Sequence, residues 1–143
     1  MIVESIIKVK GSGVFTVHSG RDLAETAKLL TSKRIGAVIV TDDDGGICGV
    51  LSERDIVHAI ANEGASVLTR PVGDFMTGNV ITCTLHDTID HCMALMTGRR
   101  FRHLPVVEGD QIKGIISIGD VVKHRINETQ QEAEALREYI TTG

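Results

Sequence analysis

The hydrophobic and polar positions of this chain repeat one pattern twice. In the first copy, an extended segment at residues 14–17 precedes a helix at residues 22–33, whose apolar residues recur every three to four positions. The β-branched run at residues 35–41 predicts a buried strand. An Asp- and Gly-rich turn then leads to a second strand at residues 47–51, and a second helix follows at residues 52–61. The first copy therefore has the predicted order β-α-β-β-α.

The second copy of the pattern begins 66 residues later. Thr16 aligns with Thr82, and after one single-residue gap in the acidic turn Ser52 aligns with Ser117. The same elements are predicted in the same order: a short first strand at 80–82, a helix at 88–97, strands at 102–108 and 111–117, and a last helix from residue 118.

The duplication predicts how the chain is organised. One three-stranded sheet with two helices is too small to bury its apolar face, so two β-α-β-β-α repeats are expected to pack together with pseudo-two-fold symmetry. The expected fold class is α/β, in the α+β sense. The expected division is residues 1–62 for repeat 1, 63–71 for a linker, 72–126 for repeat 2 and 127–143 for a C-terminal helical tail.

The tail becomes amphipathic through Ala133, Leu136 and Ile140. This pattern fits either a solvated extension of the last helix or a helix that binds a partner or a second copy.

Composition narrows the partners. The 143 residues carry a net charge of −4, which gives no electrostatic footprint for nucleic acid. With one Tyr, three Phe and no Trp, the core must be aliphatic. No apolar run of about 18 residues occurs, and residues 1–10 lack the apolar stretch of a signal peptide, so we expect no membrane span and no secretion. Three unpaired cysteines are typical of reduced thiols in a cytoplasmic protein.

The motif with chemical content is Gly-x-x-Ser-x-x-Asp, at each predicted junction from second strand to last helix. It stands once at residues 49–55 and again at residues 114–120. One interpretation is structural, because Ser followed three residues later by an acid resembles a helix capping box. The other is ligand binding: a helix N-terminus suits a phosphate, a carboxylate can accept both hydroxyls of a ribose, and the glycine would let a ligand approach the backbone.

These elements together resemble CBS repeats, and their pair resembles a Bateman module. The resemblance covers about residues 10–126 and includes residues 34–40, 72–77 and 102–107 besides the two Ser-x-x-Asp motifs. It implies that adenosine-containing ligands, such as AMP, ADP, ATP, NAD(H) or S-adenosylmethionine, bind in a cleft between the repeats. Aspartates would hold ribose, serines would lie near ribose or phosphate, and the first strands would line the adenine. Carried over onto this sequence, the candidate nucleotide-binding residues are Thr16, Ala37, Ser52, Arg54, Asp55, Thr82, Arg102, His103, Pro105, Ser117 and Asp120.

The resemblance also implies a role. Stand-alone CBS-pair proteins are usually regulators or sensors that form homodimers. We therefore expect a homodimer that is not an enzyme and requires no cofactor, with an unidentified protein target as a further candidate partner. A ligand-independent dimerisation adapter that binds a protein partner is the alternative. No acid–base constellation for catalysis is recognisable, and the spacing of His86, His91 and Cys92 does not suit a metal site.

Overall fold

Residues 1–11 and 13–142 are described by a computed structural model of the protein. Their contacts divide the chain into two units, Gly13–Thr82 and Met1–Ser12 with Cys83–Gly143. Both units contain helices and strands, which confirms the predicted α+β class.

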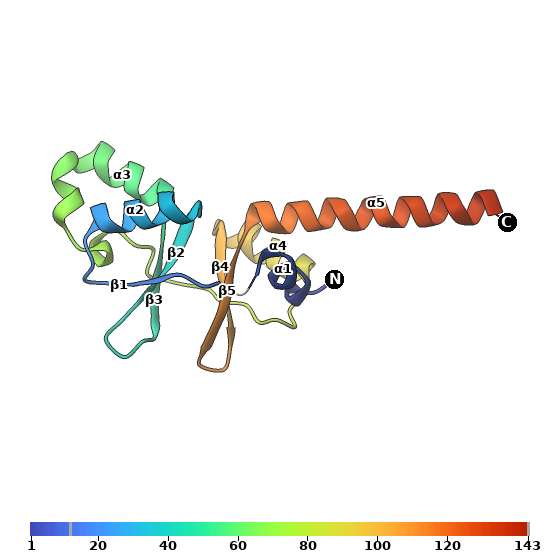
Figure 1. The fold of residues 1–143 in the computed structure, drawn as a ribbon, viewed down its shortest axis with the longest axis horizontal. Helices are drawn as coiled ribbons and strands as arrows, with labels where there is room; N and C mark the ends of the chain where they lie inside the picture. Colours follow the sequence, from blue (N-terminus) through green and yellow to red (C-terminus); the bar gives the residue numbers. More distant parts are fainter. Residues whose placement is uncertain (12, 143) are drawn as a thin grey trace. The chain divides into compact units, whose positions relative to one another are not determined.

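The unit Gly13–Thr82 is built on a three-stranded sheet of order β1-β2-β3. Strand β1 pairs in parallel with β2, and β2 pairs antiparallel with β3. Helices α2 and α3 pack on one face of this sheet (Figure 1). The bounds are Thr16–His18 for β1, Leu23–Lys33 for α2, Ala37–Thr41 for β2, Ile47–Ser52 for β3 and Glu53–Glu63 for α3.

The core of this unit is aliphatic, as the composition predicts. Val38 and Val40 lie two positions apart on β2 and belong to one buried cluster with residues of α2 and α3, so they point to the helix-covered face. Leu23 and Leu30 lie seven positions apart on α2 and meet them there. Helix α2 begins where its pattern predicts, because the Asp22 carboxylate accepts a hydrogen bond of 2.8 Å from the Glu25 N–H.

The segment after α3 also belongs to this unit. It forms two 3-10 helices, η1 (Ala65–Thr69) and η2 (Val72–Asp74). Val67 and Val72 are fully buried in the core of this unit. The predicted linker 63–71 therefore supplies one core residue, Val67, and Val72 at the predicted start of repeat 2 packs in the same core. Pro71 is the N-cap of η2, in agreement with the short helical turn that it predicts.

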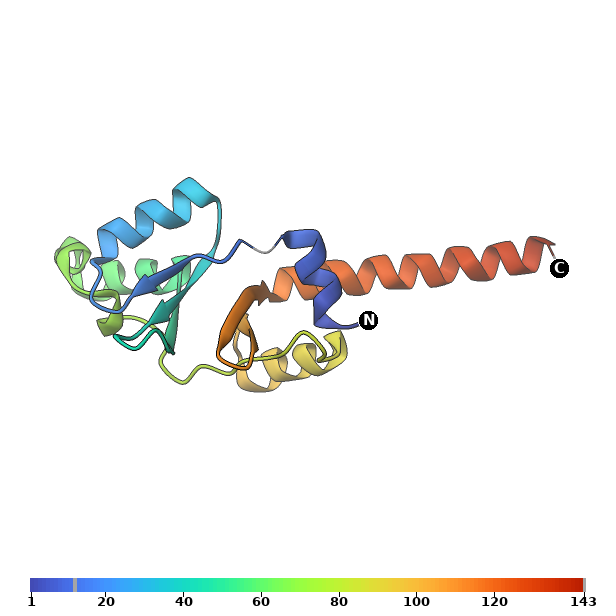
Figure 2. The same cartoon turned by 60° about the horizontal axis from the view of Figure 1, so that its bottom comes forward.

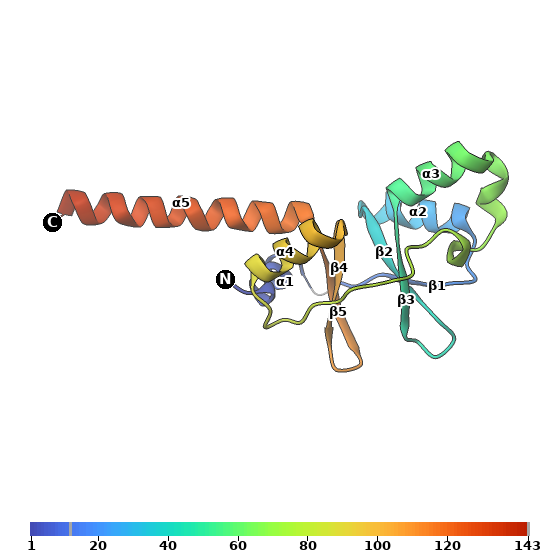
Figure 3. The same cartoon turned by 180° about the vertical axis from the view of Figure 1, so that it is seen from behind.

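The other unit combines a hairpin with three helices. Helices α1 and α4 lie beside the beginning of the long helix α5 (Figure 3). The bounds are Val3–Lys10 for α1, Ile89–Arg99 for α4, His103–Glu108 for β4, Gln111–Ser117 for β5 and Ile118–Thr142 for α5.

Helix α1 was not predicted. Its signal is nevertheless present, because the apolar residues Val3, Ile6 and Ile7 have helical spacing. Val3 is 0% and Ile6 is 1% exposed, which shows that this short helix is part of the core.

The first strand predicted for the second copy, at residues 80–82, is wrong. Only a single parallel bridge forms in this part of the second copy, between Cys83 and Val106, the repeat equivalents of the paired Val17 and Val40. The Cys83 N–H donates to the Pro105 carbonyl at 2.9 Å, and the Val107 N–H donates to the Cys83 carbonyl at 2.9 Å. In a parallel ladder the next bond toward the N-terminus needs an N–H from residue 105, and proline has none. The ladder therefore stops after one bridge.

The two copies share irregular details as well as their elements. The β2–β3 ladder shifts register after Val40, and the β4–β5 ladder does so after the equivalent Val106. Helices α2 and α4 both end at an arginine with left-handed backbone, Arg34 with φ 54° and Arg100 with φ 58°. Such backbone is uncommon for a residue with a side chain, so its recurrence supports a true internal repeat.

The cysteines are free thiols, as predicted. Cys83 and Cys92 are buried, and a hydrogen bond to Cys92 together with burial raises the pKa of the Cys83 thiol. Cys48 is half-buried, and burial raises the pKa of its thiol too.

The motif glycine Gly49 has a packing role in this structure. A Cβ at this position would collide with Met76 and lie 2.9 Å from the Thr77 carbonyl oxygen. Thr77 is held there by two backbone hydrogen bonds with Val50, of 3.0 and 3.1 Å. In the second copy, Gly114 similarly makes room for Ile7 of α1.

We predict that Gly49→Ala lowers the free energy of unfolding by about 1–3 kcal/mol, because the backbone at Thr77 must move to admit the methyl group. Urea unfolding of the full chain measures this change. Gly78→Ala is the matched control, since its Cβ meets nothing within 4 Å. Equal stability of the two variants would show that the contact at Gly49 is unimportant.

Candidate functional site

The first candidate junction lies where β3 passes into α3. Ala37 of β2 is the register partner of Ser52, the last residue of β3. The Glu53 N–H donates to the Gly36 carbonyl at 3.0 Å and fixes the start of α3 against the start of β2. Strand pairing thus places Ala37 and Ser52 side by side.

The second junction, from β5 to α5, repeats this backbone geometry. His103 of β4 is the register partner of Ser117, and the Ile118 N–H donates to the Arg102 carbonyl at 2.9 Å. These residues are the equivalents of Ala37, Ser52, Glu53 and Gly36 in the repeat alignment.

Both Ser-x-x-Asp motifs form capping boxes. The Asp55 N–H donates to Ser52 Oγ at 3.2 Å, and the Ser52 N–H donates to Asp55 Oδ2 at 2.9 Å. The corresponding distances for Ser117 and Asp120 are 3.1 and 2.9 Å. The structural interpretation of the motif is therefore confirmed.

The caps leave part of each motif open. Only Oδ2 of Asp55 and of Asp120 takes part in the cap; among the described residues, Oδ1 of either carboxylate accepts no hydrogen bond. The first turn of α3 has a similar opening. The N–H groups of Glu53 and Asp55 donate to Gly36 and Ser52, whereas the N–H of Arg54, between them, has no partner within the described chain. The same holds for Gly119, between Ile118 and Asp120. Each junction thus presents one carboxylate oxygen and one backbone donor.

The remaining residues predicted for the first junction gather at the same end of the sheet. Thr16 is exposed on β1 and is the register partner of Ile39, two positions along β2 from Ala37. Ala37 itself is 4% exposed, so a ligand can contact only the small accessible part of this residue. The Arg54 side chain is exposed on the first turn of α3.

The residues predicted for the second junction are grouped by β4. Arg102 is exposed and His103 is half-buried, whereas Pro105 is buried. Thr82 is exposed and directly precedes Cys83, whose N–H is bonded to the Pro105 carbonyl. The single bridge at Cys83 therefore holds the chain beside β4, as the expected first strand would have done.

Lys10 of α1 distinguishes the second junction from the first. Its ammonium donates to Asp120 Oδ2 at 2.7 Å and to the Ile115 carbonyl at 2.9 Å. Burial of the Asp120 carboxyl opposes its ionisation. The hydrogen bond and charge of Lys10, together with the hydrogen bonds of Ser117, outweigh burial and hold the pKa of Asp120 below its ordinary value of 3.8. Sequence reasoning missed this contact because α1 was not predicted.

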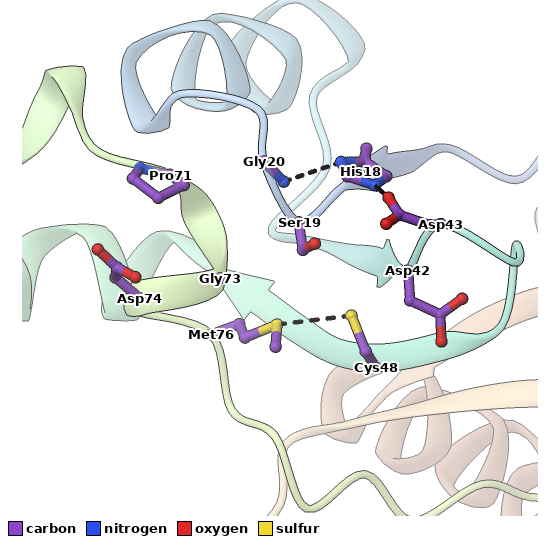
Figure 4. Close-up of a pocket in the computed structure, with 10 residues that line it drawn as sticks. All are labelled: His18, Ser19, Gly20, Asp42, Asp43, Cys48, Pro71, Gly73, Asp74 and Met76. Atoms are coloured by element: carbon purple, nitrogen blue, oxygen red, sulfur yellow. Dashed lines mark hydrogen bonds and ion pairs between the residues drawn. The ribbon is translucent and has the colours of Figure 1, made fainter.

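A pocket of about 510 Å³ lies at the opposite end of the β1-β2-β3 sheet (Figure 4). Its lining includes a hydrogen-bonded His18–Asp43 pair with Nε2 and Oδ1 2.6 Å apart. Gly20 donates its N–H to His18 Nδ1 at 2.9 Å, so the proton of the neutral ring is on Nε2. Asp42 and Asp74 add further carboxylates. An anionic phosphate would be repelled here, and no residue predicted to bind nucleotide lines this pocket.

In residues 1–11 and 13–142, no helix is long and apolar enough to cross a membrane. The same residues hold no group of three or more His, Cys, Asp or Glu side chains arranged to bind a metal ion.

The comparisons with known proteins all indicate the same family. A family model of the CBS domain matches residues 7–62 and 72–127. The crystal structure of the CBS-domain-containing protein ATU1752 from Agrobacterium tumefaciens is 47% identical, has a TM-score of 0.81, and covers 87% of this chain and 92% of that chain. The mitochondrial CBS domain-containing protein CBSX3 of Arabidopsis thaliana is 34% identical over 123 residues, 83% of this chain and 60% of that protein. The chain thus spans less than two thirds of this curated relative.

Two similar structures contain ligands. The CBS domain pair of protein MJ0100, in complex with 5'-methylthioadenosine and S-adenosyl-L-methionine, is 25% identical with a TM-score of 0.78, over 90% of this chain and 98% of that chain. The structure of CBSX2 in complex with AMP is 26% identical with a TM-score of 0.66, over 81% of this chain and 90% of that chain.

The Lys10–Asp120 pair predicts a pH dependence of stability. A lowered pKa in the folded state stabilises the fold above the unfolded pKa of about 3.8 and loses this contribution as the pH falls through the folded value. We expect Lys10→Met to lower the free energy of unfolding at pH 7 by roughly 0.5–1 kcal/mol, a screened value for a partly exposed pair. The loss of stability on acidification below that pKa should also become shallower. Urea unfolding across the acid range measures both effects.

Lys8→Met is the control, because its partner Glu4 forms only an exposed ion pair one turn away on the same helix. Superimposable pH profiles of Lys10→Met and wild type would contradict the assigned role of Lys10.

Proposed function

Because the chain belongs to the CBS-domain family, with CBS domains at residues 7–62 and 72–127, we propose that it is a regulatory module that binds an adenosine-containing ligand and is not an enzyme. The candidate ligands are AMP, ADP, ATP and NAD(H). Support comes from the ligands of similar structures, which are AMP in one and 5'-methylthioadenosine with S-adenosyl-L-methionine in another. All three compounds contain adenosine, so recognition of adenosine is the part of the function that these similarities favour.

The observation that carries the proposal is that each capping box engages only one oxygen of its aspartate carboxylate. Oδ2 is bonded to the Ser N–H and holds the side chain in one orientation, while Oδ1 of Asp55 and of Asp120 has no partner within the described chain. A carboxylate fixed in this way can accept a ribose hydroxyl without losing further side-chain freedom.

The neighbouring groups suit the rest of a nucleotide. The open N–H groups of Arg54 and Gly119 stand in the first turns of α3 and α5, where the helix dipole favours an anion. The exposed Arg54 side chain adds a cation for phosphate at the first junction. We assign adenine to Thr16 with Ala37 in the first copy and to Thr82 with Pro105 in the second.

Arg102, His103 and the two serines complete the proposed set. Arg102 and His103 are consecutive at the start of β4 and would approach phosphate at the second junction. Ser52 and Ser117 are already engaged in caps, so their part in binding is to orient the aspartates.

We further propose a homodimer in the cytoplasm with no nucleic-acid or membrane partner. The exposed apolar side chains of α5 support self-association, the three free thiols suit a reducing compartment, and the net charge of −4 does not favour polyanions.

Isothermal titration with AMP, ATP and NADH tests the proposed function. We expect at least one of them to bind wild type, and Asp55→Asn or Asp120→Asn to weaken it by about 10- to 100-fold through loss of a charged hydrogen bond. The asparagine keeps the size of the side chain, and thermal unfolding checks that each variant is folded.

Asp44→Asn is the matched control, because it makes the same change in the β2–β3 turn. Absence of heat and of a thermal shift with all three compounds at about 1 mM would reject nucleotide sensing and favour the adapter alternative.

A further inference from the structure

Helix α5 carries a mainly apolar stripe, interrupted by one threonine, that its own unit leaves exposed. We call this stripe the seam and define it as Val122, Ile126, Thr129, Ala133, Leu136 and Ile140. Successive members are four and three residues apart in strict alternation, which is the heptad spacing of a coiled coil. Leu136 is 60% and Ile140 is 69% exposed. Large apolar side chains in this arrangement indicate a surface that binds another helix.

A different face of α5 holds the helix on its own unit. Val121 is fully buried, and His124 and Glu128 on the same face are half-buried. Arg125 reinforces the attachment through Asp90 at 3.4 Å, and Glu128 pairs with the N-terminal amine at 3.7 Å. At about 100° per residue, the centres of this face and of the seam lie about 120° apart. The seam is therefore accessible along its length while α5 stays attached.

The second half of α5 extends past α1 and α4 (Figure 2). Residues 129–141 are exposed all round the helix. An isolated helical extension of this length is marginal in water, so packing of the seam would stabilise it.

We propose that the seam binds the seam of a second copy of this chain, as a parallel two-stranded coiled coil. The proposal rests on the homodimer proposed above and is independent of nucleotide binding. Charge selects the occupant and its direction. With Ile126, Ala133 and Ile140 at heptad position a, Glu132 occupies position g and Arg137 the following position e. In a parallel pair, Glu132 of each copy meets Arg137 of the partner subunit, which gives two attractive contacts.

The antiparallel pairing that matches all six seam positions has the wrong charges. It centres on residue 131 and sets Glu132 against Glu132 of the partner subunit, and Lys123 against Arg137 of the partner subunit. Like charges at these flanking positions oppose that arrangement.

The composition of the seam also sets its strength. Its outer positions are Val122, Ile126, Leu136 and Ile140, which supply most of the apolar contact, whereas Thr129 and Ala133 in the middle supply little. We therefore expect a dimer that dissociates on dilution rather than an obligate one.

Sedimentation equilibrium of the full chain tests the seam. Wild type should be a reversible dimer, and Leu136→Asp should raise its dissociation constant about 100-fold. Leu136 is largely exposed in the single chain, so this change should leave the unfolding of the globular units unaltered. Its affinity for nucleotide should also be unchanged.

A charge exchange tests the parallel direction. Glu132→Arg and Arg137→Glu should each raise the dissociation constant about tenfold, and the double variant should restore it. An equimolar mixture of the two single variants should form a heterodimer, since each then meets the opposite charge. Glu134→Arg is the control, because it makes the same charge change on another face of α5.

The outcomes separate the proposals. A monomeric wild type overturns both the homodimer and the seam. A dimer that Leu136→Asp leaves intact overturns the seam alone. Loss of dimer in the single charge variants without restoration in the double variant overturns the parallel arrangement.

Discussion

The hydrogen bond from the serine N–H to the aspartate carboxylate is the contact on which both junctions depend. It joins the last residue of a strand to the first turn of a helix, and so fixes the angle at which α3 leaves β3 and α5 leaves β5. A second bond ties the start of each helix to the beginning of the neighbouring strand, through the carbonyl of Gly36 just before β2 or of Arg102 just before β4. The Ser-x-x-Asp motif therefore combines the two interpretations. It forms a helix cap, and the atoms that the cap leaves unbonded, the aspartate Oδ1 and one backbone N–H, form the candidate binding site.

The same backbone geometry carries different side chains in the two copies. Arg54 gives the first junction a cation on its own helix, where the second copy has Gly119. At the second junction, Lys10 places a cation on Asp120 from a helix that has no counterpart in the repeat pattern. Duplication thus preserved the backbone and allowed the electrostatics of the two junctions to diverge.

Local signals in the sequence predicted most of the fold. The β-branched run before Thr41, the helical spacing around Leu30 and the Ser-x-x-Asp caps each depend on neighbouring residues, and all were observed. The errors arose where distant residues decide. Pro105 ends the ladder that residues 80–82 were expected to join, and the Lys10–Asp120 pair spans 110 positions of sequence. Gly49 likewise leaves room for Met76 and Thr77, which are more than 25 positions away and which no local pattern reveals as its packing partners.

The placement of α1 has a consequence for the order in which the chain is made. Gly13–Thr82 is an uninterrupted stretch, so all of its contacts are available once that stretch has left the ribosome. Helix α1 is synthesised earlier than this stretch. Its Ile7 nevertheless packs against Gly114 and its Lys10 bonds to Asp120, so neither contact can form until those later residues have been made. Helix α1 therefore reaches its contacts with β5 and α5 only after those elements have been made, although it precedes them in the chain by about a hundred residues.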